Sequence, residues 1–455
     1  MSAILCPAWA TPETGSLGLD SAGPSCGHQN RERGVRLTPK ERAMLAGEQG
    51  PGVQKAIEIV VALGRIYGAE ELVPVESVQV AGVSYKNLGR AGLGFLHEWA
   101  QDDGRVRVPT CLNPAGMDLR RWKELGIDEG FARPQLQVIK AFAAMGIDAT
   151  CTCTPYHIGQ VPSLGAHLAW AESSAVSFAN SALGARTNRE GGPSALAAAI
   201  SGRTAKYGLH CEENRLGSVE VVVNCPVEEV ADWGALGYLV GKQVQNGVPF
   251  FSDLGNRTAG ELELVSRPDD SPFSSSLTDR LKALGAAMAA SGAVALYHIR
   301  GVTPEARAGD MLRPDHTTVV IDSLESGYEA LSQGGATTEI DLVWLGCPHA
   351  SLPQVARLAA FAEGKRFLPD VWITTSRHVR RQAKDAGHVA AIEAAGGEVV
   401  ADTCVVVAPV GGRYHTMATE SAKGACYAPS YLGMDVRYGN WEQLQRVMLT
   451  GRWEA

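Results

Sequence analysis

The chain is short of several features that would assign it to a common class of protein. It has no hydrophobic run of the roughly 18 residues that a membrane-spanning helix needs. The segment Met1 to Ala10 has no basic group ahead of its short apolar stretch, so it does not resemble a secretory signal peptide. Ten cysteines in 455 residues are too few for a disulfide scaffold. We therefore expect a cytoplasmic protein with no membrane partner, whose thiols are reduced and mostly buried.

The chain also has fewer basic than acidic residues. The 41 lysines and arginines are outnumbered by 49 aspartates and glutamates, and the formal net charge is -8. Proteins that bind nucleic acid need a basic face, so no nucleic-acid partner is expected. No P-loop, GxSxG or GxGxxG motif opens a strand–turn–helix unit, which argues against NTPases, hydrolases and dinucleotide-binding enzymes. No CxxC pair is present, so the spacing indicates neither a zinc ribbon nor a ferredoxin-type site.

The length of the chain predicts a sizeable core divided over two or three domains. Residues 1–36 are rich in Gly, Ser, Pro and Arg and lack periodicity, which predicts a flexible extension. We expect its Cys6 and Cys26 to take no part in chemistry. Order is expected to begin at Thr38, an N-cap residue, with Glu41 completing a capping box at the start of a helix.

Helical and strand patterns alternate along the rest of the chain. In the C-terminal half the patterns predict helices at 277–291, 324–332, 352–362 and 378–395, and strands at 317–321, 340–345, 371–374 and 398–407. Earlier, an amphipathic helix over 134–145 is followed by an expected strand over 147–153. Alternation of this kind predicts an α/β protein with mostly parallel sheets covered by helices. Its chemistry should gather at the carboxyl ends of the strands.

The densest group of polar residues lies between Trp170 and Ser194, just ahead of a predicted helix. Glycines let a backbone approach a ligand, and a helix N-terminus presents unpaired N–H groups to an anion. Arginines there could bind a carboxylate or phosphate through two hydrogen bonds each. The alternative is an ordinary turn whose surface arginines pair with Glu190. The candidate substrate-binding residues are Arg186, Asn188, Arg189, Gly191, Gly192 and Ser194.

Three cysteines stand at places where a metal site could form. Cys347 follows a predicted strand, Cys404 lies inside another, and Cys111 opens a loop. Cys151 and Cys153 are one residue apart on an expected strand and should share a face. Taken one at a time, each cysteine fits a buried small side chain at least as well as a ligand.

Other loops carry hydroxyl groups and histidines. Ser84 and Tyr85 come after a strand-like run, and Ser376 follows the strand that ends at Thr374. These residues could contact a ligand, or they could cap helices. His157 and His349 are candidates for acid–base work, although a lone histidine is more often a structural hydrogen-bonding partner.

Several segments together resemble the aconitase X family. They are LxxxExAMLxGExG at 37–50, GVSYKNLG at 82–89, LNPAGMD at 112–118, TCTPYHIG at 152–159, AESSAVSFANSALGARTNREGGPS at 171–194, GCPH at 346–349 and SAKGACYAP at 421–429. They occur in family order over nearly the whole chain. The resemblance implies that residues 37–455 form an aconitase-type catalytic, or large, part with about three α/β domains. It also implies an iron–sulfur cluster of 2Fe-2S, 3Fe-4S or 4Fe-4S type, held by Cys111, Cys347 and Cys404, and a separate small subunit.

The reaction that the resemblance implies is removal of water from a small hydroxy acid. The expected substrate is cis-3-hydroxy-L-proline, which would give pyrroline-2-carboxylate, and the alternative is mevalonate 5-phosphate. Iron would stabilise the departing hydroxide, while Arg186 and Arg189 would hold the substrate carboxylate. The candidate catalytic residues are Ser84, Tyr85, Ser173 and Ser376. Two other classes stay open, a mononuclear metal lyase using Cys347, His349 and Cys404, and a cluster-sensing regulatory protein that binds RNA.

Overall fold

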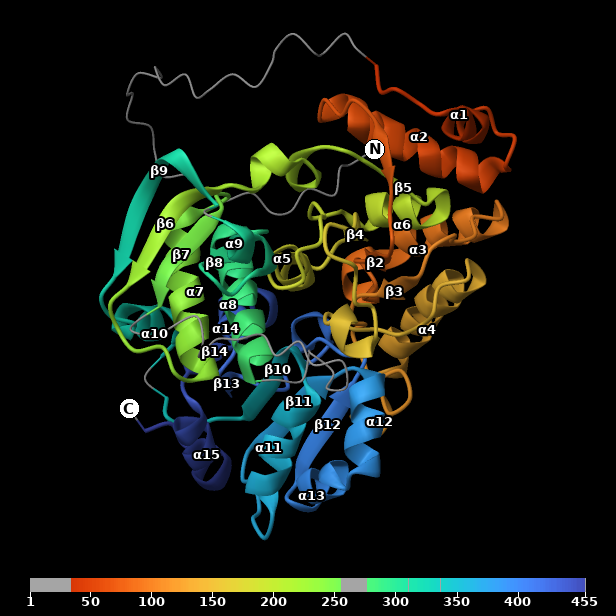
Figure 1. The fold of residues 1–455 in the computed structure, drawn as a ribbon. Coiled ribbons are helices and arrows are strands. Elements are labelled where there is room, and N and C mark those ends of the chain that lie inside the picture. Colours follow the sequence, from red (N-terminus) through yellow and green to blue (C-terminus); the bar gives the residue numbers. More distant parts are fainter. Residues whose placement is uncertain (1–33, 255–275, 310, 336, 455) are drawn as a thin grey trace, which may run out of the picture.

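The computed structural model describes residues 34–254, 276–309, 311–335 and 337–454, which form three α/β domains packed around a common centre (Figure 1). The predicted fold class, with mostly parallel sheets flanked by helices, is confirmed. Most of the extension predicted over residues 1–36 lies outside the described residues, so its flexibility stays a prediction. Of its last residues, Arg36 forms an isolated parallel bridge with Glu71.

The first domain begins with the expected capping box, in which Thr38 and Glu41 cap each other's backbone. Its central sheet is parallel, in the order β3-β2-β4, and a two-stranded antiparallel sheet joins β1 to β5. The strands are β1 (Leu72–Pro74), β2 (Val78–Val80), β3 (Thr110–Leu112), β4 (Ala169–Trp170) and β5 (Arg203–Ala205). The helices are α1 (Pro39–Leu45), α2 (Pro51–Ile66), α3 (Tyr85–Gln101), α4 (Glu129–Ala144), α5 (Ser173–Ser181) and α6 (Gly192–Ser201).

The second domain has a four-stranded parallel sheet in the order β8-β7-β6-β9. Its strands are β6 (Gly217–Val223), β7 (Pro249–Leu254), β8 (His298–Ile299) and β9 (Leu312–Ile321). Its helices are α7 (Val230–Val244), α8 (Ser276–Gly292), α9 (Pro304–Ala308) and α10 (Glu325–Leu331). Helices α7 and α8 approach very closely, because a Cβ atom at Gly292 would lie 1.9 Å from the carbonyl oxygen of Gly241.

The third domain is a five-stranded parallel sheet in the order β12-β11-β10-β13-β14. Its strands are β10 (Leu342–Ala350), β11 (Asp370–Thr375), β12 (Gly397–Ala401), β13 (Thr416–Thr419) and β14 (Asp435–Tyr438). Its helices are α11 (Leu352–Ala362), α12 (Arg377–Asp385), α13 (His388–Ala394), α14 (Ala422–Leu432) and α15 (Trp441–Thr450).

Several sequence-based boundaries were wrong, among them that of the strand expected over 340–345, which is β10 and includes Cys347, and in two cases a residue with positive φ gives the reason. The helix expected over 378–395 is broken into α12 and α13 because Gly387 takes a left-handed φ of 82°. The strand expected over 398–407 ends at Ala401, because Asp402 takes φ 61° and turns the chain out of the sheet. Cys404 therefore lies in a loop. The strand expected over 147–153 is reduced to one isolated bridge, between Cys151 and Leu112.

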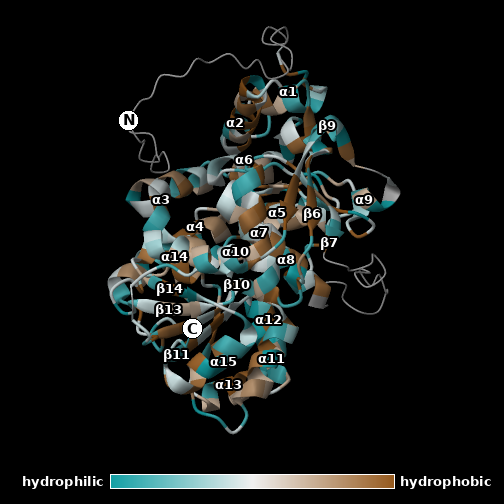
Figure 2. Cartoon of the chain, turned by 90° about the vertical axis from the view of Figure 1, so that its left-hand side faces the viewer, coloured by the Kyte–Doolittle hydropathy of each residue, from teal (hydrophilic) through white to brown (hydrophobic). Residues whose placement is uncertain are grey.

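The buried hydrophobic side chains hold the three domains together. One core cluster is shared by all three domains, for example through Trp170 of β4 in the first, Trp233 of α7 in the second and Trp344 of β10 in the third. Figure 2 shows hydrophobic residues concentrated on the inner strands such as β6 and β7, and hydrophilic ones on outer helices such as α12. Across the part of the chain that the structure describes, every helix is too short or too polar to cross a bilayer.

Candidate active site

The carboxyl ends of strands from different domains face one another at the centre of the molecule. Asn113 follows β3 and Glu172 follows β4, both in the first domain, while Lys423 lies in the first turn of α14, after β13 of the third domain. The ammonium group of Lys423 forms an ion pair with the Glu172 carboxylate. This contact joins residues that are 251 positions apart in the sequence, so the site exists only in the folded chain.

The Glu172–Lys423 pair is nearly buried, with the two side chains 14% and 11% exposed. Asn113 Nδ2 donates to Glu172 Oε2 at 2.8 Å, and Lys423 Nζ lies 3.2 Å from the hydroxyl of Ser173. Burial alone would raise the pKa of Glu172, but the charge and hydrogen bond of Lys423 outweigh it and lower that pKa to about 2. Burial opposes the charge of Lys423, yet the Glu172 carboxylate raises its pKa above the ordinary value. Both groups are therefore charged at neutral pH.

Three thiols from separate segments lie beside this pair. They are Cys153 of the first domain, Cys347 on β10 and Cys404 in the loop after β12. Burial is the main reason why the pKa of each thiol is raised. Cys404 also raises the pKa of both Cys347 and Cys153, and Cys153 raises that of Cys347. The charge of Lys423 opposes this rise at all three sulfurs. Binding of a metal cation stabilises the thiolate and so promotes loss of the proton from such a thiol.

His349 fixes the position of the loops that carry these cysteines. Its Nε2 lies 2.9 Å from the carbonyl oxygen of Thr403, which can only accept, so Nε2 carries the proton. Its Nδ1 accepts from the hydroxyl of Thr152 at 3.0 Å, and its backbone N–H points at Cys153 Sγ at 3.1 Å. Burial lowers the pKa of His349 to about 4, so the ring is neutral.

These contacts do not suit the mononuclear lyase that was one alternative. Both ring nitrogens of His349 are already used, and within the described residues no three His, Cys, Asp or Glu side chains come close enough to hold one metal ion. A tetrahedral ion with bonds of about 2.3 Å needs ligand atoms within roughly 4 Å of one another. A cluster with several iron atoms holds its cysteines farther apart. Iron–sulfur clusters are held by cysteine thiolates, and these three residues are donors of that type.

The structure does not bring Cys111 to the other two cysteines of the predicted trio. Cys111 lies inside β3, opposite Gln79 of β2, and is fully buried. Its electrostatic neighbours are Asp148 and Cys151, not Cys347 or Cys404. Side chains alternate between the two faces of a strand, and Cys111 is one position before Leu112, the last residue of β3. The side chains of Cys111 and Leu112 therefore point to opposite faces of the sheet. The third thiol that lies near Cys347 and Cys404 is that of Cys153.

Of the four predicted catalytic residues, Ser173 alone contacts the ion pair. The Ser84 hydroxyl donates to the carbonyl oxygen of Val407 at 3.0 Å, so it ties the first domain to the loop after Cys404. Tyr85 makes a hydrogen bond through its backbone N–H, which donates to Gln135 Oε1. The Ser376 hydroxyl caps α12 by accepting from the N–H of Val379. A catalytic role for Ser84, Tyr85 and Ser376 stays a prediction without a contact to support it.

The charges of the two predicted arginines act on different groups. Arg186 extends beside His210, whose carbonyl oxygen lies 3.5 Å from its Nη1, and its charge acts on His167 and His210. Arg189 is exposed, and its charge is one of the causes that lower the pKa of Glu172. Arg189 is therefore the predicted substrate-binding residue within electrostatic reach of the site.

The other four predicted substrate-binding residues hold the local chain. Asn188 bonds the backbone of Tyr207 and Leu209. Gly191 and Gly192 begin α6, where a Cβ atom at Gly192 would lie 2.7 Å from the carbonyl oxygen of Ala81. The Ser194 hydroxyl donates to Glu190 Oε2 at 2.6 Å. The carboxylate of Glu190 thus already lies at the start of α6.

Four residues of the site were not singled out from the sequence, namely Asn113, Cys153, Glu172 and Lys423. All four lie inside segments that carry the family resemblance, at LNPAGMD, TCTPYHIG, AESS and SAKG. The candidates predicted from the same segments were hydroxyl groups, arginines and cysteines at strand ends. A charged residue in a family segment after a strand was the better indicator.

Three family models match consecutive parts of the chain. They are the aconitase X first domain over residues 34–213, the second domain over 217–329 and the third domain over 340–450. The crystal structure of Thermococcus kodakaraensis aconitase X in its holo form matches with a TM-score of 0.80 and 43% sequence identity, covering 91% of this chain and all of that one.

Named relatives fall into two groups. The phosphomevalonate dehydratase large subunit of Methanothermobacter thermautotrophicus is 48% identical over 414 residues, which cover 90% of this chain and 98% of that protein. The cis-3-hydroxy-L-proline dehydratase of Pseudomonas aeruginosa is 36% identical over 434 residues, which cover 92% of this chain and 71% of that protein.

Proposed function

The chain belongs to the aconitase X family, and from this premise we propose that it is the large subunit of a dehydratase acting on mevalonate 5-phosphate. The reaction class is that of its relatives, which are dehydratases. The specific substrate is supported by four relatives named phosphomevalonate dehydratase large subunit, which are 44 to 48% identical to the chain.

The sequence-based prediction of cis-3-hydroxy-L-proline as the substrate was wrong. Relatives with that activity in their names are 36% and 32% identical, well below the four phosphomevalonate dehydratase large subunits at 44 to 48%, although a fifth such subunit, from Aeropyrum pernix, is 35% identical. The prediction rested on overall composition, which reports neither the shape nor the charge of a substrate pocket. The dehydratase class itself is confirmed.

Elimination of water removes a proton from the carbon beside the carboxylate and a hydroxide from the next carbon, leaving a C=C bond. An iron–sulfur cluster, when bound, supplies the Lewis acid that stabilises the departing hydroxide. The residues that would hold it are Cys153, Cys347 and Cys404, whose convergence from three segments suits a cluster better than a single ion. His349 would keep two of their loops in place.

Lys423 and Arg189 would supply positive charge to the substrate anion. Glu172, whose pKa is about 2, is a weak proton acceptor, so we assign it to holding Lys423 charged and oriented rather than to proton abstraction. Ser173 is the nearby hydroxyl that could contact substrate. The names of the relatives imply a separate small subunit, which would close over this site and exclude water.

The observation that carries the proposal is the meeting of three thiols with the buried Glu172–Lys423 pair. Its test begins with co-purification of the chain and a small subunit under anaerobic conditions, followed by an assay for dehydration of mevalonate 5-phosphate. Turnover of this substrate is expected. An iron-loaded complex that binds mevalonate 5-phosphate without dehydrating it would refute the substrate assignment.

Cysteine variants test the ligand set independently of turnover. We expect C153A, C347A and C404A each to lose most iron and acid-labile sulfide, while C111A, which alters a more deeply buried cysteine, retains both. The opposite result for C111A and C153A would reinstate the trio first expected from the sequence.

A further inference from the structure

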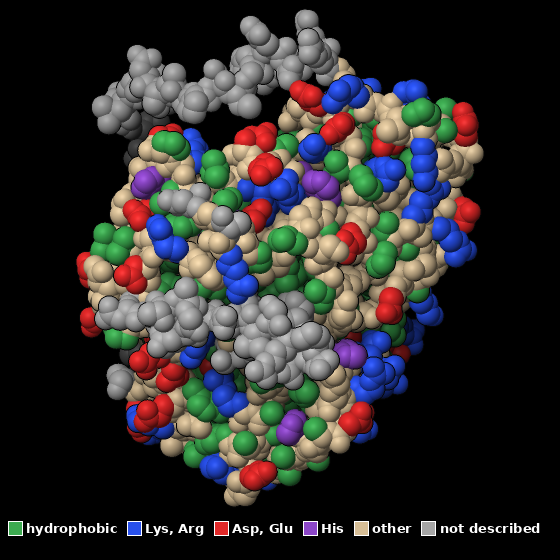
Figure 3. Space-filling model, viewed as in Figure 1, with side chains coloured by type: hydrophobic (Ala, Val, Ile, Leu, Met, Phe, Trp, Pro, Cys, Tyr) green, Lys and Arg blue, Asp and Glu red, His purple; other side chains and the backbone are tan. Residues whose placement is uncertain are grey.

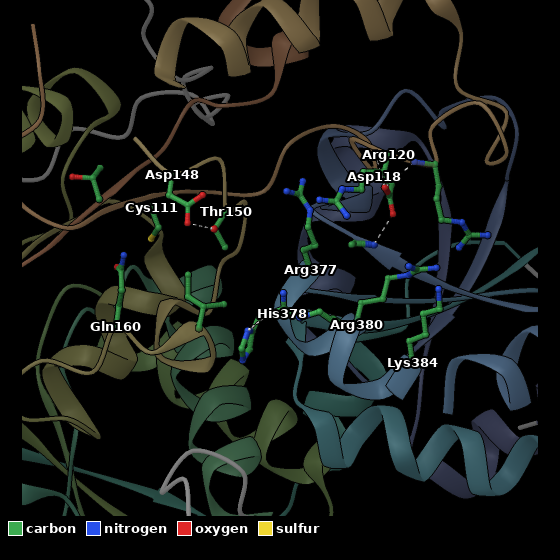
Figure 4. A pocket seen from close by; sticks show the side chains of 15 residues that line it. Cys111, Asp118, Arg120, Asp148, Thr150, Gln160, Arg377, His378, Arg380 and Lys384 are labelled. Atoms are coloured by element: carbon green, nitrogen blue, oxygen red, sulfur yellow. Dashed lines mark hydrogen bonds between the residues drawn. The ribbon is translucent and has the colours of Figure 1, made fainter. Parts of the chain in front are cut away.

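A second polar cavity lies away from the ion pair, between the first domain and α12 of the third. Its volume is about 520 Å³. One wall is formed by the ends of first-domain segments, including Thr110, Thr150 and Gln160, and the other by α12 (Figure 4). Pockets that bind small molecules have volumes of roughly 300 to 1,000 Å³, so the cavity is of a suitable size.

The lining of this cavity carries a large excess of positive charge. Six cations contribute to it, namely Arg120, Arg121, Arg377, Arg380, Arg381 and Lys384. The lining carboxylates are Asp118 and Asp148. Asp118 is buried and already accepts hydrogen bonds from the backbone N–H groups of Arg120, Arg121 and Ala401. Figure 3 shows Lys and Arg side chains gathered along this edge of the molecule.

Half of the cations are held by partners within the protein. Arg121 pairs with Glu124 and Glu398, at 2.7 and 3.0 Å. Arg380 donates to the carbonyl oxygen of Val399 at 2.8 Å. Arg377 pairs with the buried Asp402 at 2.6 Å.

The other three, Arg120, Arg381 and Lys384, form no ion pair with any of the described residues, although Arg381 Nη2 lies 3.3 Å from His378 Nδ1. The Nε–H group of Arg377 is buried and also has no hydrogen-bond partner there. The cavity therefore contains donors that the described part of the chain leaves unused.

Three basic side chains of α12 lie on the same face of the helix. Arg377, Arg381 and Lys384 are spaced four and three residues apart, which places them on one face of the helix. Val379 and Ala383 are buried on the opposite face. The positive end of the helix dipole lies at Arg377 and adds to the field of the side chains.

We infer that this cavity, which we call the basic pocket, binds a small phosphate-bearing anion such as a phosphate ester or a diphosphate. Guanidinium groups bind phosphate oxygens through paired hydrogen bonds, and unpaired cations lose their mutual repulsion when such a ligand enters. The concave shape favours a small molecule over an acidic protein surface. This inference is independent of the proposed function, because it concerns a separate site and is measured as binding.

The test is isothermal titration of the full chain with inorganic pyrophosphate, inorganic phosphate and glycerol 3-phosphate. The variant R381A/K384A removes two unpaired charges of the pocket. The control R133A/R446A removes two exposed arginines that pair with Glu129 and Glu442 elsewhere. Both pairs lie on exposed helix faces, so both variants should fold, as circular dichroism would verify.

We expect pyrophosphate binding to weaken at least tenfold in R381A/K384A and less than twofold in R133A/R446A. Tighter binding of glycerol 3-phosphate than of inorganic phosphate would identify a phosphate ester as the preferred ligand, and tighter binding of pyrophosphate a diphosphate. Equal losses in the two variants, or no binding of any of the three anions at millimolar concentration, would overturn the inference.

Discussion

The central site and the basic pocket differ in whether their charged side chains are paired. At the centre, Glu172 and Lys423 are nearly buried and neutralise each other. In the basic pocket, exposed cations such as Arg381 stand without ion-pair partners among the described residues. A buried charge must be paired because it has lost its hydration, whereas an exposed charge keeps water around it. The comparison teaches that the centre is built for fixed geometry and the pocket for capture of a mobile anion.

The largest expected effect comes from breaking the central pair. E172Q should lower kcat/KM for mevalonate 5-phosphate by about 10³-fold, because Lys423 would lose the partner that keeps it charged and oriented. Steady-state kinetics of the purified complex would measure the loss. The matched control is E190Q, which alters a buried carboxylate beside α6 and should leave kcat/KM within about threefold. Similar losses for both variants would show that Glu172 is important only for folding.

The next effect tests how tightly the strand carrying Cys347 is held. Gly346 has φ 83°, and a Cβ atom there would lie 2.1 Å from the carbonyl oxygen of Thr374. We expect G346A to lower the free energy of unfolding by about 3 kcal/mol, from backbone strain and overpacking together. In G364A the φ of 67° is similar but no atom lies within 4 Å, so a loss of only about 1 kcal/mol is expected. Urea unfolding measures both, and equal losses would contradict the clash.

A smaller effect compares a buried histidine with a half-exposed one. Burial, with the charges of His167, Arg215 and Arg186, lowers the pKa of His210 to about 3. The unfolded chain binds this proton near pH 6.5 and the native chain does not, so stability is complete above that pH and falls as the pH is lowered toward 3.

Between pH 7.5 and 5.5 this histidine should cost about 1.4 kcal/mol of stability. The loss is the difference between the wild type and H210Q in urea unfolding at the two pH values. H378Q, which removes a histidine lining the basic pocket, should retain the full wild-type pH dependence. A wild-type pH dependence in H210Q as well would contradict the assignment.

The smallest effect lies in the basic pocket. R120A removes an exposed cation that has no ion pair among the described residues, so stability should change by less than about 0.5 kcal/mol and in the direction of an increase. Denaturant unfolding at low salt would detect the gain, which should vanish at 1 M salt as repulsion is screened. A clear loss of stability would mean that Arg120 has a stabilising partner in the folded protein. The contrast between the paired central site and the unpaired basic pocket would then not hold for this residue.

Local patterns predicted most helices and strands of the third domain. The helix over 352–362 agrees with α11, and the strand over 371–374 lies within β11. Periodicity succeeds there because a long amphipathic segment reports its own burial. It missed the turns at Asp402 and Gly387, where one residue with positive φ changes the direction of the chain.

The sequence by itself determined the α/β class, the family and the segments in which the site residues lie. Only the tertiary structure decided that Cys153, and not Cys111, lies with Cys347 and Cys404, and that Arg186 acts on His167 and His210 while Arg189 acts on Glu172. The reason is physical. The side on which a strand residue points, and the partner that it meets across a domain boundary, depend on packing between segments hundreds of residues apart, which no local spacing records.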